Sequence, residues 1–413
     1  MPVELQKLHQ APLPELLRQA RELGVPGVDS MRRGDLVFAI AQKVGEKDGS
    51  IFGRGVLEVH GEGFGFLRSP ADNFLPGSAD IYVSQSQIRR FELQTGDTVI
   101  GIVRPPKEGE RYTALLRVES INGDPAGVKS PSFDALTAIY PDERIPLHED
   151  ALLRPIDLVA PLGLGQRGLW IAPPRTGRLD VQRRLVERMT ADEDLEVTVL
   201  LLAAAPEEIN EWRTQSRAEV IATPFDEPQA RHLQVADIVF ERARRMVERG
   251  DDVVLVVDSL TRLIRACLAE IPASGRDIGG VDSAALHRIR RYMGSARALE
   301  EGGSLTVLGI VSGDGDSKLD HALIDDLRDV VNWELVFSRE IADRGIRPSI
   351  DAGRSSNHRA ERLLDAHEAA ALVQFRTGLT GDVVEDATVL LDLAASLHGK
   401  APELTPEARS AAG

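Results

Sequence analysis

The sequence predicts a multidomain α/β protein with three folded parts in a fixed order. Apolar residues at helical spacing cover the first 45 or so residues, which indicates a short helical segment. Short apolar runs separated by glycines follow between residues 52 and 121, a pattern typical of a small β-barrel. From about Asp150 onward, strand-length and helix-length runs alternate, which favours an α/β domain with a mostly parallel sheet.

The helical segment is expected to contain two helices. The first carries apolar residues at helix spacing and ends at a glycine and a proline: Leu13, Leu16, Leu17, Ala20, Leu23, then Gly24 and Pro26. The second can be capped by Asp29 or Ser30, and its apolar positions are Leu36, Ala39, Ile40 and Val44. These helices alone indicate no function.

The barrel and the α/β domain are predicted from their strands. Five short strands with glycine corners suit an OB-type barrel, at 56–59, 63–67, 80–83, 98–103 and 112–118. A turn-rich linker follows at 125–132. In the α/β domain we expect strands at 169–172, 198–203, 252–257 and 304–311, and helices at 181–189, 230–249 and 283–300. The tail from Ala401 is rich in proline and alanine and is expected to fray.

Composition excludes several classes of protein. No apolar run approaches the ~18 residues that a membrane span needs, and the first ten residues do not resemble a signal peptide. The single cysteine, Cys267, excludes an internal disulfide framework and fits a reducing cytoplasm. The net charge of −16 argues against nucleic-acid binding by bulk electrostatics, so any RNA must bind at local sites.

Two aromatic residues of the predicted barrel suggest such a local site. Phe64 and Phe66 are two residues apart and therefore share one face of a strand, with glycines on either side. Paired exposed aromatics on a barrel strand form a stacking platform for single-stranded bases. Arg68 continues the same face and can reach a phosphate or a base. The spacing fits a barrel core strand equally well.

A second candidate site begins at Gly163 and has the layout of a strand, a phosphate loop and a helix. In such loops a lysine reaches the outer phosphates and a Ser or Thr hydroxyl holds Mg²⁺. Here Arg178 takes the lysine position and Leu179 takes the hydroxyl position, so the pattern alone favours an ordinary strand-to-helix turn. Asp258 ends the apolar run 253–257, as expected for the second magnesium-binding element, although an acid capping the next helix gives the same pattern.

Long segments in the right order identify the chain as similar to the bacterial transcription termination factor Rho family. They include GFGFLRS (63–69), DIYVSQSQIRRF (80–91), RPPKEGERY (104–112), GQRGL (165–169), FDEPQARHLQVA (225–236), VVDSLTRLIRA (256–266), PASGR (272–276), GGVDSAALHR (279–288) and EEGGSLT (300–306). The resemblance implies a helical cap at 1–48, an OB-type RNA-binding domain at 49–124, a linker at 125–150 and a RecA-like domain of the P-loop NTPase type at 151–413.

The family is an RNA-dependent ATPase and 5′–3′ RNA helicase that uses ATP and Mg²⁺. The resemblance therefore implies nascent single-stranded RNA, pyrimidine-rich, as a partner, together with RNA polymerase and its elongation factors. It also implies a hexameric ring, here either of one chain or mixed with an active Rho, in the cytoplasm and away from membranes.

The resemblance carries two RNA sites onto this sequence. The primary-site positions are Phe64, Phe66, Arg68, Tyr82, Glu110 and Tyr112, where a carboxylate beside a stacked base can accept a hydrogen bond from a cytosine amino group. The secondary-site positions, in two channel loops, are Arg276 and Lys318. The first loop, RDIGG, is one residue short, and the family's FKGTGN reads LRDVVN at 327–332.

The nucleotide site is carried over with several departures. The nucleotide-binding positions are Gly163, Leu164, Gly165, Gln166, Arg167, Gly168, Arg175, Thr176, Gly177, Arg178, Leu179, Asp180 and Ala205. The catalytic positions are Asp258, which also holds Mg²⁺ indirectly, and Arg359, an arginine finger if one inserted residue is allowed; without it the position is His358. Leu179 stands where the family has its magnesium-ligating threonine. Ala204, between Ala203 and Ala205, stands where the family has its catalytic glutamate.

These departures leave three hypotheses of function. The first, which we favour, is an RNA-binding Rho-like factor with an impaired or inactive motor that acts in or modulates Rho-dependent termination. The second is a fully active RNA-dependent ATPase and helicase. The third is a protein-interaction subunit that caps or inhibits an active Rho hexamer. The replacement of three residues at 203–205 by alanine favours the first or the third.

Overall fold

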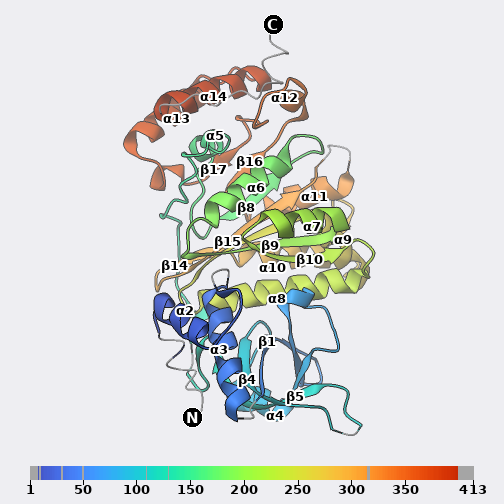
Figure 1. The fold of residues 1–413 in the computed structure, drawn as a ribbon. Coiled ribbons are helices and arrows are strands. Elements are labelled where there is room, and N and C mark those ends of the chain that lie inside the picture. Colours follow the sequence, from blue (N-terminus) through green and yellow to red (C-terminus); the bar gives the residue numbers. More distant parts are fainter. Residues whose placement is uncertain are drawn as a thin grey trace. The chain divides into compact units, whose positions relative to one another are not determined.

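A computed structural model describes residues 8, 11–28, 31–48, 51–107, 109–128, 130–313 and 317–398 (Figure 1). The chain divides into two compact units. The first contains residues 1–133 together with 234–249, and the second contains residues 134–233 together with 250–413. The predicted caps Asp29 and Ser30 and the tail from Ala401 lie outside the described residues.

The first unit begins with two helices, α2 (Leu13–Glu22) and α3 (Arg33–Asp48). Leu16, Ala20, Leu36 and Ile40 are buried as the helical spacing predicts and pack with Phe52 and Ile100 of the barrel. Leu13, at the start of α2, is 38% exposed, and the other predicted apolar positions are half-buried. Pro12 stands at the N-cap of α2, where its missing N–H costs no helical hydrogen bond. The helices therefore close one side of the barrel with a continuous apolar cluster.

The barrel is a sheet of antiparallel neighbours that closes on itself. Its strand order is β3-β2-β1-β4-β5-β6, and a parallel pairing of β3 with β5 completes the closure. The bounds are β1 (Ile51–Val59), β2 (Gly65–Arg68), β3 (Ile81–Val83), β4 (Thr98–Arg104), β5 (Thr113–Ile121) and β6 (Asp124–Pro125), with α4 (Gln85–Phe91) between β3 and β4. Alternate residues of these strands fill the interior, among them Leu57, Leu67, Val83 and Val99.

The second part of helix α8 (Gln229–Val247) belongs to this first unit, far along the chain from the barrel. Gly96 makes the close approach possible: it has φ +94°, and a Cβ there would lie 2.6 Å from the backbone nitrogen of Arg242. Arg245 donates a 2.8 Å hydrogen bond to Gln94, and Glu248 accepts one of 2.6 Å from the backbone of Phe133. The barrel unit is therefore completed by residues that no N-terminal fragment contains.

The second unit is organised around a mostly parallel sheet with the order β10-β9-β11-β15-β8-β16-β17. The strands are β8 (Arg167–Ile171), β9 (Leu195–Ala204), β10 (Glu219–Pro224), β11 (Asp252–Asp258), β15 (Ser304–Val311), β16 (Trp333–Val336) and the short antiparallel β17 (Ser356–Asn357). The antiparallel β14 (Arg297–Leu299) joins β15 to β7 (Ala138–Ile139). Central strands such as β15 are buried along their whole length, as expected where helices cover both faces.

Helices connect these strands and position the loops. They are α5 (Arg154–Val159), α6 (Arg178–Met189), α7 (Pro206–Gln215), α9 (Leu260–Glu270), α10 (Ser283–Gly294), α11 (Lys318–Leu327), α12 (Arg339–Asp343), α13 (Ala366–Thr377) and α14 (Val383–His398). A buried ion-pair cluster ties α13 to α5, because Arg144 contacts both Asp157 (3.0 Å) and Glu368 (2.6 Å). The predicted fold class of helical cap, OB-type barrel and RecA-like α/β domain is confirmed. None of the helices in the described ranges is long and apolar enough to cross a membrane.

Candidate functional site

The predicted base-binding aromatics lie together on one face of the barrel. Phe66 pairs directly with Tyr82 across β2 and β3, so their rings share a face. The ring centroid of Phe66 lies 4.9 Å from that of Tyr112, 5.8 Å from that of Phe64 and 5.9 Å from that of Tyr82. Tyr82 is 36% exposed, and both phenylalanines are half-buried. The residues are therefore a surface cluster and not a barrel core strand.

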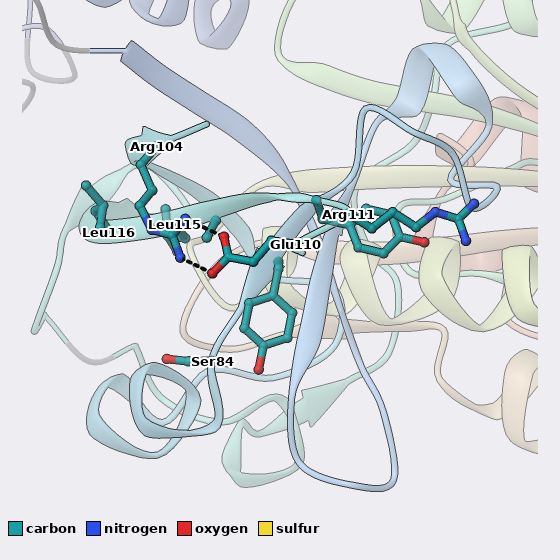
Figure 2. Close-up of a pocket in the computed structure, with 9 residues that line it drawn as sticks. Ser84, Arg104, Glu110, Arg111, Leu115 and Leu116 are labelled. Atoms are coloured by element: carbon teal, nitrogen blue, oxygen red, sulfur yellow. Dashed lines mark hydrogen bonds and ion pairs between the residues drawn. The ribbon is translucent and has the colours of Figure 1, made fainter. Parts of the chain in front are cut away.

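A pocket of ≈ 360 Å³ opens beside this cluster (Figure 2). Tyr82, Tyr112, Glu110 and Arg104 line it. Arg104 donates a hydrogen bond of 2.8 Å to one oxygen of Glu110 and pairs with the other, as the dashed lines in Figure 2 show. The Arg104 hydrogen bonds, with one from the Lys107 backbone, lower the pKa of Glu110 to about 2. Two aromatic rings and a carboxylate that is charged at neutral pH thus line a space large enough for a base.

Arg68 differs from the expectation that it reaches a phosphate or a base. Its side chain is 4% exposed and forms ion pairs with Glu58 (2.6 Å) and with Asp80. Its guanidinium carbon also lies 5.0 Å from the ring centroid of Phe66. The buried Asp80 and the half-buried Glu58 satisfy the guanidinium, so in this conformation Arg68 packs against Phe66 and does not face solvent.

The phosphate loop connects β8 to α6, as its sequence layout predicts. Two residues of the loop have positive φ, Arg175 (+65°) and Gly177 (+73°). The hydroxyl of Thr176 donates to the carbonyl of Pro173 (2.7 Å), and Ser349 donates to the carbonyl of Thr176 (2.7 Å). One hydrogen bond within the loop and one from Ser349 thus fix its conformation. The loop ends at the N-terminus of α6, where backbone N–H groups attract anions.

Arg178, in the lysine position, is engaged inside the site. It forms an ion pair with Asp258 at the end of β11, and its Nη1 also donates to Gln182 (3.3 Å). Asp258 is 1% exposed and Arg178 is 18% exposed, so the pair is shielded from solvent. The structure brings these two predicted residues together. The Arg178 guanidinium pairs with the Asp258 carboxylate, which a magnesium ion would need as a ligand.

The residues present do not fit a magnesium site. Leu179 directly follows Arg178 and is half-buried, and its side chain has no oxygen that could bind a metal ion. Among the described residues there is no cluster of three or more His, Cys, Asp or Glu side chains with metal-binding geometry. Arg178 already neutralises Asp258, so the site lacks both a hydroxyl ligand and an unpaired carboxylate for a magnesium ion.

A second arginine, which the sequence analysis missed, closes the outer side of the loop. Arg347 forms an ion pair of 2.9 Å with Asp180. A Cβ on Gly177 would lie 3.1 Å from Nη1 of Arg347, so the guanidinium sits directly against the loop. Only the tertiary fold indicates this contact, because the two residues are 167 positions apart.

The three alanines stand at the carboxyl end of β9, whose last two residues are Ala203 and Ala204. Ala204 is fully buried, Ala203 has φ +47°, and Ala205 is the N-cap of α7 without a side-chain cap. One turn further, Glu208 is half-buried, and burial raises its pKa with a further contribution from Asp258. The structure therefore places a carboxylate near Asp258, although no carboxylate stands at position 204.

The segment Gly163–Gly168, predicted to bind nucleotide, lies at the other end of β8 from the phosphate loop. Its residues precede and begin β8, whereas the loop follows Ile171, and a five-residue strand spans about 13 Å. Gly165 instead packs on the backbone of Ala298, and Arg167 donates to the carbonyls of Val330 (2.6 Å) and Ala296 (3.2 Å). Within one chain these six residues do not join the phosphate loop.

Arg359 lies at this same amino end of the sheet. It comes two residues after β17, which pairs with the start of β16. Its guanidinium lies 4.9 Å from the ring centroid of Tyr140 and 3.6 Å from Glu361, and the side chain is 55% exposed. His358, the alternative position, donates its backbone N–H to Asn332. An arginine here cannot reach the phosphate loop of its own chain, which begins at the carboxyl end of β8.

The first predicted channel loop lies against α11, the helix that begins at Lys318 of the second. The first contains the hairpin of β12 (Asp277–Ile278) and β13 (Val281–Asp282), and a Cβ on Gly279 would lie 3.0 Å from that of Ala322 in α11. Lys318 begins α11, and both it and Arg276 are exposed. Residues 314–316, just before Lys318, lie outside the described residues.

Comparisons with known proteins assign these features to a family. The Rho termination factor N-terminal domain matches residues 7–49, and the Rho termination factor RNA-binding domain matches residues 53–126. The nucleotide-binding domain of the ATP synthase alpha/beta family matches residues 153–357. The transcription termination factor Rho of Pseudomonas aeruginosa is 44% identical over 376 residues, with 89% of this chain and 90% of the relative covered. The chain belongs to the Rho family.

Other Rho proteins agree with this assignment. Those of Haemophilus influenzae and Escherichia coli are 43% and 42% identical, and each alignment covers 89% of this chain and 90% of the relative. Solved ATPases of type III secretion systems share the fold at lower identity. One has a TM-score of 0.52 at 20% identity, covering 63% of this chain and 82% of that chain. The assembled ATPase EscN has a TM-score of 0.54 at 18% identity, covering 75% and 78%.

Proposed function

We propose that this Rho-family protein binds single-stranded RNA on its barrel and hydrolyses ATP poorly or not at all. It acts in or modulates Rho-dependent termination, with nascent pyrimidine-rich RNA as ligand and RNA polymerase and its elongation factors as partners. The observation that carries the impaired motor is the shielded ion pair between Arg178 and Asp258. The Arg178 guanidinium supplies the positive charge beside Asp258 that a bound Mg²⁺ ion would otherwise supply.

The missing groups point the same way. Leu179 offers no ligand oxygen, and Ala204 cannot orient a water. Loss of charge stabilisation and of nucleophile alignment is worth a few kcal/mol each, so the rate of hydrolysis is expected to fall by several powers of ten. Nucleotide binding without turnover remains compatible with this site, because Arg175, Arg178 and the backbone of α6 can hold phosphates.

The RNA-binding part of the proposal is supported by the aromatic cluster and its pocket. Stacking on exposed rings accepts any base, whereas the Glu110 carboxylate can accept a hydrogen bond from a cytosine amino group. Changing Phe66 to Ala, in the centre of the cluster, is expected to weaken binding of oligocytidylate by about 1–3 kcal/mol. The full-length chain should be used, since residues 234–249 complete the barrel unit.

The decisive experiment measures both activities in one preparation. Full-length protein is titrated with labelled oligocytidylate and assayed for ATP hydrolysis with and without that RNA. We expect RNA binding without stimulated hydrolysis. Turnover at the rate of an ordinary ring ATPase would restore the plain helicase function, and absence of RNA binding at low salt would remove the RNA-binding proposal.

A second candidate, a subunit in a mixed ring with an active Rho, is favoured by the position of Arg359. Its exposed guanidinium lies at the amino end of the sheet, and the phosphate loop lies at the carboxyl end. In a head-to-tail ring this chain could therefore supply an arginine finger to a neighbour while its own site stays inactive. The test is native mass measurement of this chain alone and mixed with an intact Rho. A strictly monomeric mass in both samples contradicts it.

A further inference from the structure

His60 lies on the same barrel face as the predicted base-binding aromatics, although it was not among them. It directly follows the last residue of β1, and its backbone N–H donates a 2.8 Å hydrogen bond to the carbonyl of Phe64. Glu58 pairs with Phe66 in the same hairpin. Because side chains alternate along a strand, His60 and Phe64 are the next neighbours on that face.

The imidazole ring is stacked on Phe64. The two ring centroids are 5.2 Å apart and the planes differ by 12°, while Phe66 meets the imidazole edge-on at 5.6 Å and 84°. One face of the imidazole is therefore covered by Phe64, yet 38% of the side chain is exposed. Nε2 itself is buried, so the exposed area belongs to other atoms of the side chain.

Ring contacts, and not polar contacts, hold His60 in this position. Within the described residues, its Nε2 has no hydrogen-bond partner. The nearest carboxylate oxygen, on Glu58, is 3.9 Å away, and Arg68 already pairs with that carboxylate at 2.6 Å. An aromatic ring that is stacked on one face, and whose Nε2 makes no hydrogen bond, is suited to stack on a base with its other face.

The geometry points to His60 as a further RNA-binding residue, on which one additional unpaired base stacks. This inference rests on the proposed RNA binding of the barrel and extends it by one nucleotide beyond Phe64. Stacking accepts every base because every base has a π face. The nucleotide on His60 is therefore not selected by identity, unlike the base in the pocket that contains Glu110.

The test compares three full-length proteins: the unchanged chain, His60→Leu and His60→Phe. Fluorescence anisotropy at one fixed salt concentration gives the Kd for oligocytidylates that differ by one nucleotide in length. In the unchanged chain, the nucleotide that reaches His60 should improve Kd by roughly 5- to 150-fold, the range of one base–aromatic stack. That step should disappear in His60→Leu, which keeps apolar bulk against Phe64, and persist in His60→Phe.

A single 2-aminopurine placed at that nucleotide reports stacking directly. Its fluorescence should be quenched on binding to the unchanged chain and to His60→Phe, and not on binding to His60→Leu. Equal affinity steps and equal quenching in all three proteins overturn the inference, as does loss of the step in His60→Phe while its thermal midpoint is unchanged. Absence of RNA binding by the unchanged chain is a different result, and it overturns the proposed function as well.

Discussion

Arg178 and Asp258 form a shielded ion pair between the first turn of α6 and the tip of β11. The guanidinium and the carboxylate come from positions that, in an active phosphate-loop ATPase, serve the nucleotide and its metal. In this chain they serve each other. The pair therefore neutralises the Asp258 carboxylate in the absence of a bound nucleotide or metal ion.

Restoration of ATP hydrolysis should require combined substitution. The triple variant Arg178→Lys, Leu179→Thr and Ala204→Glu returns the compact cation, the metal ligand and the water-orienting carboxylate together. Because such groups act as a unit, each single variant should stay near the background rate, and the triple variant should exceed it by about 10²-fold or more. Steady-state phosphate release with oligocytidylate measures this. Full rescue by Ala204→Glu alone would contradict our account of Arg178 and Leu179.

Removing only one partner of the Arg178–Asp258 ion pair should destabilise the protein more than removing both. Arg178→Met leaves the Asp258 carboxylate buried without a partner, so we expect the free energy of unfolding to fall by about 3–5 kcal/mol. The double variant Arg178→Met/Asp258→Leu removes the buried charge as well and should recover most of that loss. Urea titrations of the unchanged chain, of the single variants Arg178→Met and Asp258→Leu, and of the double variant form the double-mutant cycle. Arg347→Met, which breaks the exposed pair with Asp180, is a matched control expected to cost less than ~1 kcal/mol.

Glu110 should titrate far below an ordinary glutamate. The Arg104 hydrogen bonds lower its pKa to about 2, so its carboxylate stays charged until the pH approaches that value. A depressed pKa contributes stability that is present above the unfolded pKa and is lost as the pH falls through the folded one. Carboxyl ¹³C NMR of the unchanged chain and of Arg104→Met tests this. In the variant the pKa of Glu110 should rise toward ~4.3, the value of a free glutamate, and stay below it because the Lys107 backbone hydrogen bond remains.

The pKa of Glu208 should be shifted in the opposite direction to that of Glu110. Burial and the neighbouring Asp258 raise its pKa, so the folded protein holds that proton more tightly than the unfolded chain. The carboxylate therefore costs stability once the pH has risen through the raised pKa, and costs nothing below the unfolded pKa. We expect Glu208→Gln to stabilise the protein at pH 7.5 and to have no effect at pH 4. Equal effects of the substitution at both pH values, in thermal unfolding, would contradict this assignment.

The sequence by itself determined the fold class and the composition of both candidate sites. Helical spacing in 13–23, short strands with glycine corners, and buried strand runs each express a local period, so the elements could be predicted without knowing their neighbours. The replacements Leu179 and Ala204 are likewise visible in the sequence, because the chemistry that a leucine and an alanine lack does not depend on their surroundings.

Only the tertiary structure decided what the charged and aromatic side chains contact. Arg68 was expected at the surface and is buried between two carboxylates, and Arg178 was expected to face phosphate and pairs with Asp258. His60 joined the aromatic face because the hairpin pairing set it against Phe64. Ion pairs and ring stacks form between residues that are distant in sequence or paired by strand register, and local periodicity contains no information about such partners.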